Sequence, residues 1–349
     1  MKTFFGKLWH AMVTHKVLTI FTAIAIVGIV ISFSILGVLV WSRYSRGVVP
    51  TDAQIAQLRE NGQVYDHVVI FGVDGAGGYF DKMDTPGFDS VFKNDKLDSS
   101  VTYTALSQFP TESGYNWGSM IHGVRNVKHK LDNHNTTNQK YTDTKYPSFF
   151  KVYAERHPDS YMVSIVDWAN INVGIIEDLP QVEKINPIVA PADTWTESEK
   201  LVDTAVCEET INQIKNNNPT IVFTHFDCVD AAGHSYGWGK PEYIDAMKHV
   251  DQIIGKIYQA CVEQGWENNT LFMCVSDHGH MNNGGHGGNQ YNVRNVVFAV
   301  AGGKGNIING TPGYVVTQDV ASVVLYALGE KQPSSWESRV PKNIFKGLK

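Results

Sequence analysis

Short apolar runs alternate with amphipathic stretches along the chain after residue 64. The runs are β-branched or aromatic and are bounded by turn residues, which predicts buried strands. They cover residues 67–73, 101–106, 161–166, 220–226, 271–276 and 296–301. Between them, residues 241–258 place Tyr243, Met247 and Val250 on one stripe of a helix that begins at Pro241. This alternation predicts an α/β fold with a mostly parallel central sheet and helices on both faces.

Capping residues indicate two further helices. Thr196 and Glu199 have the spacing of a capping box for a helix that runs to about residue 215. Gly329 follows a helical pattern over residues 318–328 and suits its C-terminal end. The polar stretch 125–145 is predicted to run over the surface beside the functional site.

The N-terminal part of the chain has a different pattern, because residues 17–41 contain no charged side chain. At about 1.5 Å per residue, a helix of this length crosses a bilayer core of about 30 Å. The segment that follows lacks the small residues of a signal-peptide cleavage site, so we predict an uncleaved transmembrane anchor. The expected organisation is a tail over 1–16, the anchor over 17–41, a stalk over 42–64 with a short helix near 52–60, and one α/β domain over 65–349.

Charge and composition exclude several classes of protein. Hydrophobic residues make up 43% of the chain, which excludes a disordered or collagenous protein. Lys and Arg number 29 against 35 Asp and Glu, and no basic block follows the anchor, which argues against a nucleic-acid polymer as partner. Basic residues are balanced on the two sides of the anchor. We expect the domain to be extracytoplasmic, because a large domain after a single N-terminal anchor usually translocates.

Candidate catalytic groups follow the ends of the predicted strands, where functional groups gather in doubly wound sheets. Asp74 comes directly after the first strand and is followed by glycines that would leave its carboxylate open to a cation. Ser113 lies where a loop after the second strand enters a short helix, a position that favours an anion. Taken alone, Asp74 also fits a simple turn, and Ser113 also fits an ordinary helix cap.

Two further strand ends carry carboxylates and imidazoles. Asp230 and His234 are four residues apart across a turn of small residues. Asp277 and His278 end another strand, and a glycine-rich loop then leads to His286. Because this loop has no core of its own, we expect a metal to hold it. The mixed nitrogen and oxygen donors favour Zn²⁺ over Mg²⁺ or Ca²⁺.

In this order, the motifs resemble the alkaline phosphatase superfamily, and most closely its type I phosphodiesterase and nucleotide pyrophosphatase branch, over residues 66–329. The Pro-Thr-x-Thr/Ser motif of that branch matches residues 110–113, and its Asp-x-x-Gly-His motif matches residues 230–234. The resemblance implies that Ser113 is the nucleophile and that Asn116 contacts the transferring phosphoryl oxygen. It also implies two divalent metal ions, with zinc expected. The implied ligands are Asp74, Ser113, Asp277 and His278 for one ion, and Asp230, His234 and His286 for the other.

This resemblance implies a function. We expect a membrane-anchored two-zinc phosphoric ester hydrolase that cleaves a small phosphate ester or nucleotide through a phosphoseryl intermediate on Ser113. One alternative is a transferase that passes a phosphoryl or phosphoethanolamine group to a lipid or glycan, and another is a non-catalytic surface binding protein on the same fold. His286 follows His278 by only 8 residues, earlier than in nucleotide pyrophosphatases. Ser113 lacks the Cys/Ser-x-Pro-x-Arg context of sulfatases, which argues against sulfate esters.

The other polar residues near these motifs receive simpler interpretations. We expect His280 to be a solvated loop residue, with support of a metal ligand as the alternative. His225 is expected to be a hydrogen-bonded residue of the strand end, and Trp117 to belong to the packing. Asp227 could hydrogen-bond a ligand histidine, as carboxylates near metal sites do.

Overall fold

The computed structural model describes residues 2–45 and 47–348, with only part of the side chains in residues 2–45. Its contacts separate the chain into two units, Met1–Arg46 and Gly47–Lys349. The first unit is one uninterrupted helix, α1 Lys2–Ser45, which includes most of the expected tail. The expected anchor over residues 17–41 falls within α1, but the side chains of residues 17–21, 23 and 38–41 lie outside the described part. Among the residues that are described, no helix combines the length and the hydropathy that crossing a membrane requires.

A mixed sheet forms the centre of the second unit. Within residues 47–348 it has seven strands in the order β2-β7-β6-β1-β5-β3-β4. Their bounds are β1 His67–Val73, β2 Asp98–Leu106, β3 Met162–Val166, β4 Val182–Ile185, β5 Ile221–Phe226, β6 Thr270–Val275 and β7 Asn295–Gly302. Strand β7 is antiparallel to both β6 and β2, and the other neighbouring strands are parallel. The predicted, mostly parallel sheet is therefore confirmed.

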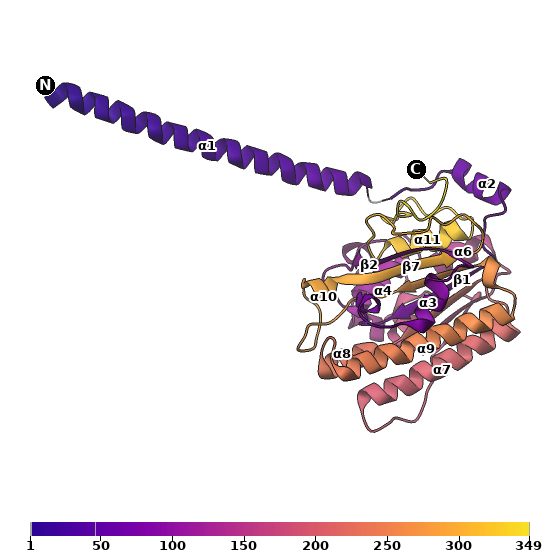
Figure 1. The fold of residues 1–349 in the computed structure, drawn as a ribbon. Helices are drawn as coiled ribbons and strands as arrows, with labels where there is room; N and C mark the ends of the chain where they lie inside the picture. The colour runs from indigo at the N-terminus through magenta and orange to yellow at the C-terminus, as the bar shows by residue number, and fades with distance from the viewer. Residues whose placement is uncertain (1, 46, 349) are drawn as a thin grey trace. The chain divides into compact units, whose positions relative to one another are not determined.

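Helices cover both faces of this sheet, as the alternation predicts (Figure 1). Along β1, Val68 and Ile70 pack into one hydrophobic core, while Val69 and Phe71 pack into the other. One core contains helices α3 Pro86–Phe92, α7 Trp195–Asn216, α8 Cys228–Tyr236 and α9 Pro241–Glu263. The other contains α2 Asp52–Glu60, α4 Ser113–His122, α6 Phe149–Arg156 and α11 Asp319–Ala327. The shorter turns of helix are η1 Tyr79–Asp81, α5 Asn126–His129, η2 Asn135–Thr137, η3 Ile171–Ile175, η4 Glu267–Asn269 and α10 Tyr291–Arg294.

The six predicted strands are present, and β4 is the strand that the sequence pattern missed. It lies at the edge of the sheet, and of its four residues only Val182 is buried. A strand with one buried position contains no apolar run, so periodicity cannot detect it.

The predicted helix caps are partly correct. Pro241 lies in the first turn of α9, and Gly329 follows α11 with a φ of +72°, both as expected. The capping box at Thr196 is wrong. The helix begins at Trp195, because the extended Thr194 accepts a hydrogen bond from the backbone N–H of Glu197 at 3.2 Å.

Helix α2 has the bounds that the sequence predicts for a short helix in the stalk. Its Ile55 and Leu58 are buried in the core of the second unit. Arg59 forms an ion pair with Glu330 at 2.9 Å and also binds the carbonyl of Gly329 at 2.8 Å. This helix is therefore packed into the α/β unit.

Glu337 ties the C-terminal segment to the start of α5. Its carboxylate accepts hydrogen bonds from the guanidinium of Arg125 at 2.9 and 3.1 Å and from the backbone N–H of Arg125 at 3.1 Å. Lys128 lies 3.2 Å away. Burial opposes the ionisation of Glu337, but these contacts prevail and lower its pKa to about 2.

We expect Glu337→Gln to lower the free energy of unfolding by about 1–2 kcal/mol at pH 7. A pKa that falls from 4.5 to about 2 corresponds to about 3 kcal/mol, and solvent screening of the half-exposed Arg125 reduces this value. A carboxyl group whose pKa is lower in the folded than in the unfolded state stabilises the fold at pH values above its unfolded-state pKa. The difference from wild type should therefore shrink as the pH falls from about 4.5 toward about 2. Urea denaturation at pH 7 and pH 3 measures it, and equal differences at both would contradict this account.

Candidate active site

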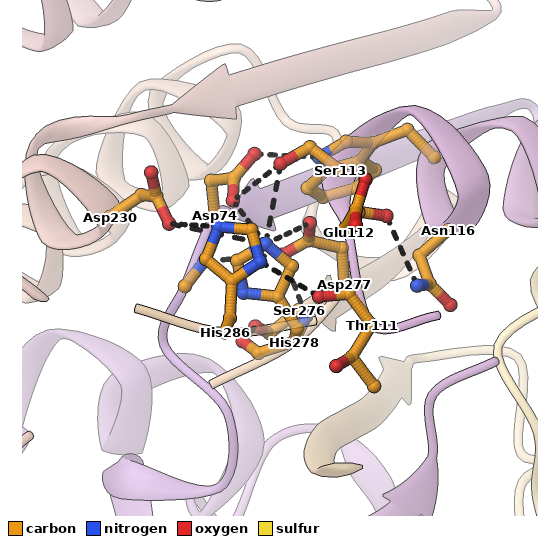
Figure 2. A network of polar contacts seen from close by, with 12 residues as sticks. Asp74, Thr111, Glu112, Ser113, Asn116, Asp230, Ser276, Asp277, His278 and His286 are labelled. Carbon is orange, nitrogen blue, oxygen red and sulfur yellow. Dashed lines mark hydrogen bonds and ion pairs between the residues drawn. The ribbon is translucent and has the colours of Figure 1, made fainter. Parts of the chain in front are cut away.

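The candidate nucleophile, Ser113, is the first residue of α4. Glu112 before it is extended and forms the cap, so the serine hydroxyl lies at the helix N-terminus, where free amides and the helix dipole favour negative charge. Ser113 is 7% exposed. Its Oγ lies 3.4 Å from Asp74 Oδ1 and 3.3 Å from His278 Nε2 (Figure 2).

The first group of candidate metal ligands joins the ends of β1 and β6. Asp74 follows β1, and Asp277 and His278 follow β6, the neighbouring parallel strand, so their side chains leave the same edge of the sheet. One ligand atom from each lies within 4.8 Å of the others. His278 Nε2 is 3.5 Å from Asp74 Oδ1 and 3.2 Å from Asp277 Oδ2. All three side chains are buried.

The second group comes from α8 and the glycine-rich loop. Asp230 and His234 lie one helical turn apart, with His234 Nε2 at 3.4 Å from Asp230 Oδ2. His286 Nε2 lies 3.1 Å from His234 Nε2 and 3.9 Å from Asp230 Oδ1. His278 Nε2, at 4.0 Å from Asp230 Oδ1, connects the two groups. The structure therefore brings Ser113 and all six predicted Asp and His ligands together.

Thr111 connects the nucleophile loop to the loop that carries His286. Its carbonyl oxygen contacts His286 Nδ1 at 2.8 Å and accepts the N–H of Gly287 at 3.0 Å. Its hydroxyl donates to the carbonyl of Gly288 at 2.7 Å. The contact at Nδ1 leaves Nε2 of His286 directed at His234 and Asp230.

The two groups of side chains fit divalent cations. Asp277 Oδ2 is buried and accepts no hydrogen bond within the described residues, although His278 Nε2 lies 3.2 Å away, and a buried carboxylate oxygen is costly unless a cation compensates it. The Nε2 atoms of His234 and His286 lie 3.1 Å apart, so both nitrogens can reach one cation. Carboxylate and imidazole donors are the ligand types of Zn²⁺ and related metals.

Burial and neighbouring groups shift the pKa values of three candidate ligands. Burial and repulsion from Asp74 raise the pKa of Asp230 to about 7, and the same two causes raise the pKa of Asp277. Burial and the neighbouring His286 lower the pKa of His278. A bound cation would favour ionised carboxylates and neutral imidazoles, the states that bind metals.

Three further residues contact the candidate ligands: His225 is a hydrogen-bonded strand residue and Trp117 a core residue, both as expected, and His280 takes the place that the sequence analysis gave as its alternative. His225 Nε2 lies 3.0 Å from Asp74 Oδ2, and Trp117 donates its indole N–H to the same oxygen at 2.8 Å. His280, expected to be solvated, is fully buried with Nε2 at 2.9 Å from Asp230 Oδ1, so that expectation is wrong. The one sequence signal for His225 is its place inside an apolar strand, since a buried polar side chain requires a partner.

Two asparagines lie near the nucleophile. The carboxamide of Asn116 accepts the N–H of Gln108 at 2.7 Å and donates to carbonyls of the loop before Ser113, one of which is shown in Figure 2. Its contact with a phosphoryl oxygen stays a prediction. Asn133 comes from the stretch 125–145, and its Oδ1 accepts the N–H of Gly114 at 2.6 Å, directly after the nucleophile.

A further set of carboxyl groups lies beside the site at the N-terminal end of α8, where Asp227 is the N-cap residue. Asp227 lies within 4.8 Å of Asp74 and His225, and Asp203 accepts the N–H groups of Asp227 and Cys228 at 2.9 and 3.1 Å. Burial and repulsion among these carboxylates raise the pKa values of Asp227 and of the adjacent Asp167. Burial and mutual repulsion therefore favour the protonated forms of these carboxyl groups.

We expect His225→Leu to weaken metal binding about 10–100-fold, because residues that orient a ligand contribute this much to metal affinity. The substitution removes the hydrogen bond to Asp74 and keeps most of the side-chain volume. His225→Gln retains a donor and should recover part of the affinity. Competition with a chelator measures the affinity. As a control, His249→Ala removes a hydrogen-bonded histidine of α9, and an equal loss in that variant would contradict the role of His225.

Comparison with known proteins places these motifs among phosphoester enzymes. Residues 68–324 match the family model of type I phosphodiesterase/nucleotide pyrophosphatase. GPI ethanolamine phosphate transferase 1 of Gibberella zeae is 26% identical over 165 residues, which are 40% of this chain and 16% of that protein. The catalytic subunit of GPI ethanolamine phosphate transferase 3 of Homo sapiens is 34% identical over 87 residues, 25% of this chain and 8% of that protein. The chain thus corresponds to a small part of these longer relatives.

Solved structures share the fold at low sequence identity. Murine ectonucleotide pyrophosphatase/phosphodiesterase 5 has a TM-score of 0.56 and 12% identity, over 77% of this chain and 96% of that chain. BT1596, a 2-O GAG sulfatase, has a TM-score of 0.57 and 14% identity, over 79% of this chain and 73% of that chain. These likenesses show the fold alone.

Proposed function

The chain belongs to the type I phosphodiesterase/nucleotide pyrophosphatase family of the alkaline phosphatase superfamily, and from this premise we propose that it is a metal-dependent phosphoethanolamine transferase. Ser113 takes the phosphoethanolamine group from a phosphodiester donor, and an alcohol acceptor then removes it. The observation that carries the proposal is the buried Ser113 Oγ, at 3.4 Å from Asp74 and 3.3 Å from His278. The names of the two curated relatives support the choice of transferred group.

In this proposal the side chains of the site have separate roles. Asp74, Asp277 and His278 would hold one divalent cation, and Asp230, His234 and His286 would hold the other. We infer zinc from their mixed donors. When bound, the cations act as Lewis acids that favour the alkoxide of Ser113 and neutralise charge on the phosphoryl oxygens.

The reaction proceeds in two displacements. Ser113 Oγ forms a bond to phosphorus, and the bond from phosphorus to the leaving oxygen breaks. The N-terminal amides of α4 face the charge on the phosphoryl oxygens. His225 and Trp117 keep the carboxylate of Asp74 in place. The acceptor alcohol then attacks the phosphoserine and frees Ser113, and two inversions give net retention of configuration at phosphorus.

The hydrolase expected from the sequence is the second candidate, with water in place of the alcohol. The family model, which covers residues 68–324 and is described as a phosphodiesterase, favours it. The curated relatives favour transfer. The two functions share the first displacement and differ only in the group that attacks the phosphoserine.

A panel of chromogenic esters tests both candidates on the metal-loaded full chain. It contains p-nitrophenyl 2-aminoethyl phosphate, p-nitrophenyl phosphate, bis-p-nitrophenyl phosphate and a nucleotide p-nitrophenyl ester, each with increasing concentrations of an alcohol acceptor. Formation of a diester of the acceptor supports transfer. Release of the phosphomonoester alone, at every acceptor concentration, supports hydrolysis. The absence of nitrophenol from all four esters, with metal bound, would leave a non-catalytic binding protein.

We also propose that residues 17–41 anchor the protein in a membrane, with the α/β domain extracytoplasmic. The absence of charged side chains from this segment supports the proposal. Extraction of membranes with alkaline carbonate tests it, since recovery of the full chain in the soluble fraction would exclude an integral anchor.

A further inference from the structure

Trp195, the first residue of α7, lies exposed beside the candidate metal ligands. Its side chain is 48% exposed. Its ring stacks on the ring of His234 with centroids 5.8 Å apart and an interplanar angle of 26°. The indole therefore forms a wall of the site on the side of His234, with one face bound to protein and the remaining surface available to a ligand.

Glu199, one helical turn after Trp195, holds this indole in place. Glu199 Oε1 accepts the indole N–H at 2.6 Å. Within residues 47–348 no ion pair involves Glu199, and the adjacent Lys200 is engaged by Glu197 and Asp245 instead. The carboxylate is only partly buried, so it remains accessible to a ligand cation.

The carboxylate of Glu199 gives this pair its negative charge. An anionic group of a ligand would be repelled by it, whereas a cation would be attracted both to this carboxylate and to the indole face.

We propose that Trp195 and Glu199 form a subsite for the ammonium group of the substrate, so that the enzyme selects phosphodiesters of amino alcohols. This inference rests on the proposed function, which places the phosphoryl group between Ser113 and the ligands Asp230, His234 and His286. In a phosphoethanolamine group two carbon atoms separate the phosphate oxygen from the nitrogen. That short span requires the ammonium group to bind beside the reaction centre, and Trp195 stacks on His234, whose Nε2 lies 3.1 Å from His286 Nε2.

Two ligands of nearly equal size and different charge test the subsite. Phosphoethanolamine carries an ammonium group, and propyl phosphate carries a methyl group at the same place. Calorimetric titration of the metal-loaded Ser113→Ala chain should show about tenfold tighter binding of phosphoethanolamine, a typical gain for a cation on an indole face beside a carboxylate. Adding Trp195→Ala or Glu199→Gln should reduce this preference to about twofold or less. Trp195→Phe, which keeps an aromatic face, should retain part of it.

The ratio of the two affinities distinguishes loss of ammonium recognition from a general structural defect, because such a defect would weaken the binding of both ligands equally. Glu197→Gln is the matched control, since Glu197 lies on the same helix, is exposed and pairs with Lys200 rather than Trp195. Equal affinities in the Ser113→Ala chain, or Trp195 and Glu199 variants that leave the preference unchanged, would overturn the subsite.

Kinetics then separate this inference from the proposed function. With wild-type chain, kcat/KM for p-nitrophenyl 2-aminoethyl phosphate should exceed that for p-nitrophenyl propyl phosphate by about tenfold. Turnover of both esters at equal rates would overturn the subsite and leave the proposed reaction intact. Turnover of neither, with the calorimetric preference present, would overturn the reaction and leave the subsite.

Discussion

Replacing Ser113 by alanine should abolish turnover while both metal ions remain bound. We expect kcat for any phosphodiester to fall by at least about 10⁴-fold, because the variant cannot form the covalent bond to phosphorus and the remaining groups only bind and polarise the substrate. The side chain is small and occupies the first position of α4. The fold should therefore persist, and the six Asp and His ligands should keep their positions.

Three measurements check this result. Release of nitrophenol gives the rate, elemental analysis gives the metal content, and mass spectrometry of acid-quenched wild-type chain should show a phosphorylated peptide that contains Ser113. Ser235→Ala is a suitable control, since this exposed serine lies on α8. Unchanged activity in Ser113→Ala would remove the serine from its role. Loss of metal together with activity would make it chiefly a ligand.

Removing Asp230 should have the second largest effect, the loss of one metal ion and of most activity. Asp230 contacts His234 at 3.4 Å and His280 at 2.9 Å, so its carboxylate organises the second ligand group. In Asp230→Ala the imidazoles of His234 and His286 lose their anionic partner, and a cation there would lack charge compensation. We expect at least a roughly 10³-fold fall in kcat/KM. His234→Ala should act in the same direction.

Elemental analysis of the purified variants distinguishes this outcome from unfolding. Wild type should hold two metal ions per chain, and Asp230→Ala one, with a circular dichroism spectrum like that of wild type. Asp245→Asn removes an exposed carboxylate that pairs with Lys200, and it should leave both metal content and activity near wild type. Full metal occupancy in Asp230→Ala would contradict the assignment of this ligand.

The likeness to sulfatases concerns the fold and not the nucleophile. The sulfatase BT1596 shares the architecture at 14% identity. Ser113, however, follows Pro110 and Thr111 and begins a helix, and no Cys/Ser-x-Pro-x-Arg segment surrounds it. The architecture places the candidate nucleophile at a helix N-terminus beside the candidate metal ligands, and under the proposed function the local sequence decides which ester is attacked.

The sequence predicted the parts of this site that depend on neighbours along the chain. Asp74, Asp277 and His278 were found because each follows an apolar run that predicts a strand, and strand ends gather at one edge of a parallel sheet. The motif order from Asp74 to His286 then indicated the family. The edge strand β4 was missed, because a strand with only Val182 buried shows no apolar run.

The partners of buried polar side chains were decided by the tertiary structure alone. His225 binds Asp74 across 151 positions of sequence, and His280 binds Asp230 across 50. No local pattern encodes such a pair. The sequence of a segment indicates which of its own side chains are buried, but it does not indicate which distant side chain each of them contacts. The sequence by itself thus determined the chemistry of the candidate ligands and the places of Asp74, Asp277 and His278 at strand ends. Only the packing of distant segments decided which histidines contact the candidate ligands and that Trp195 lies on His234.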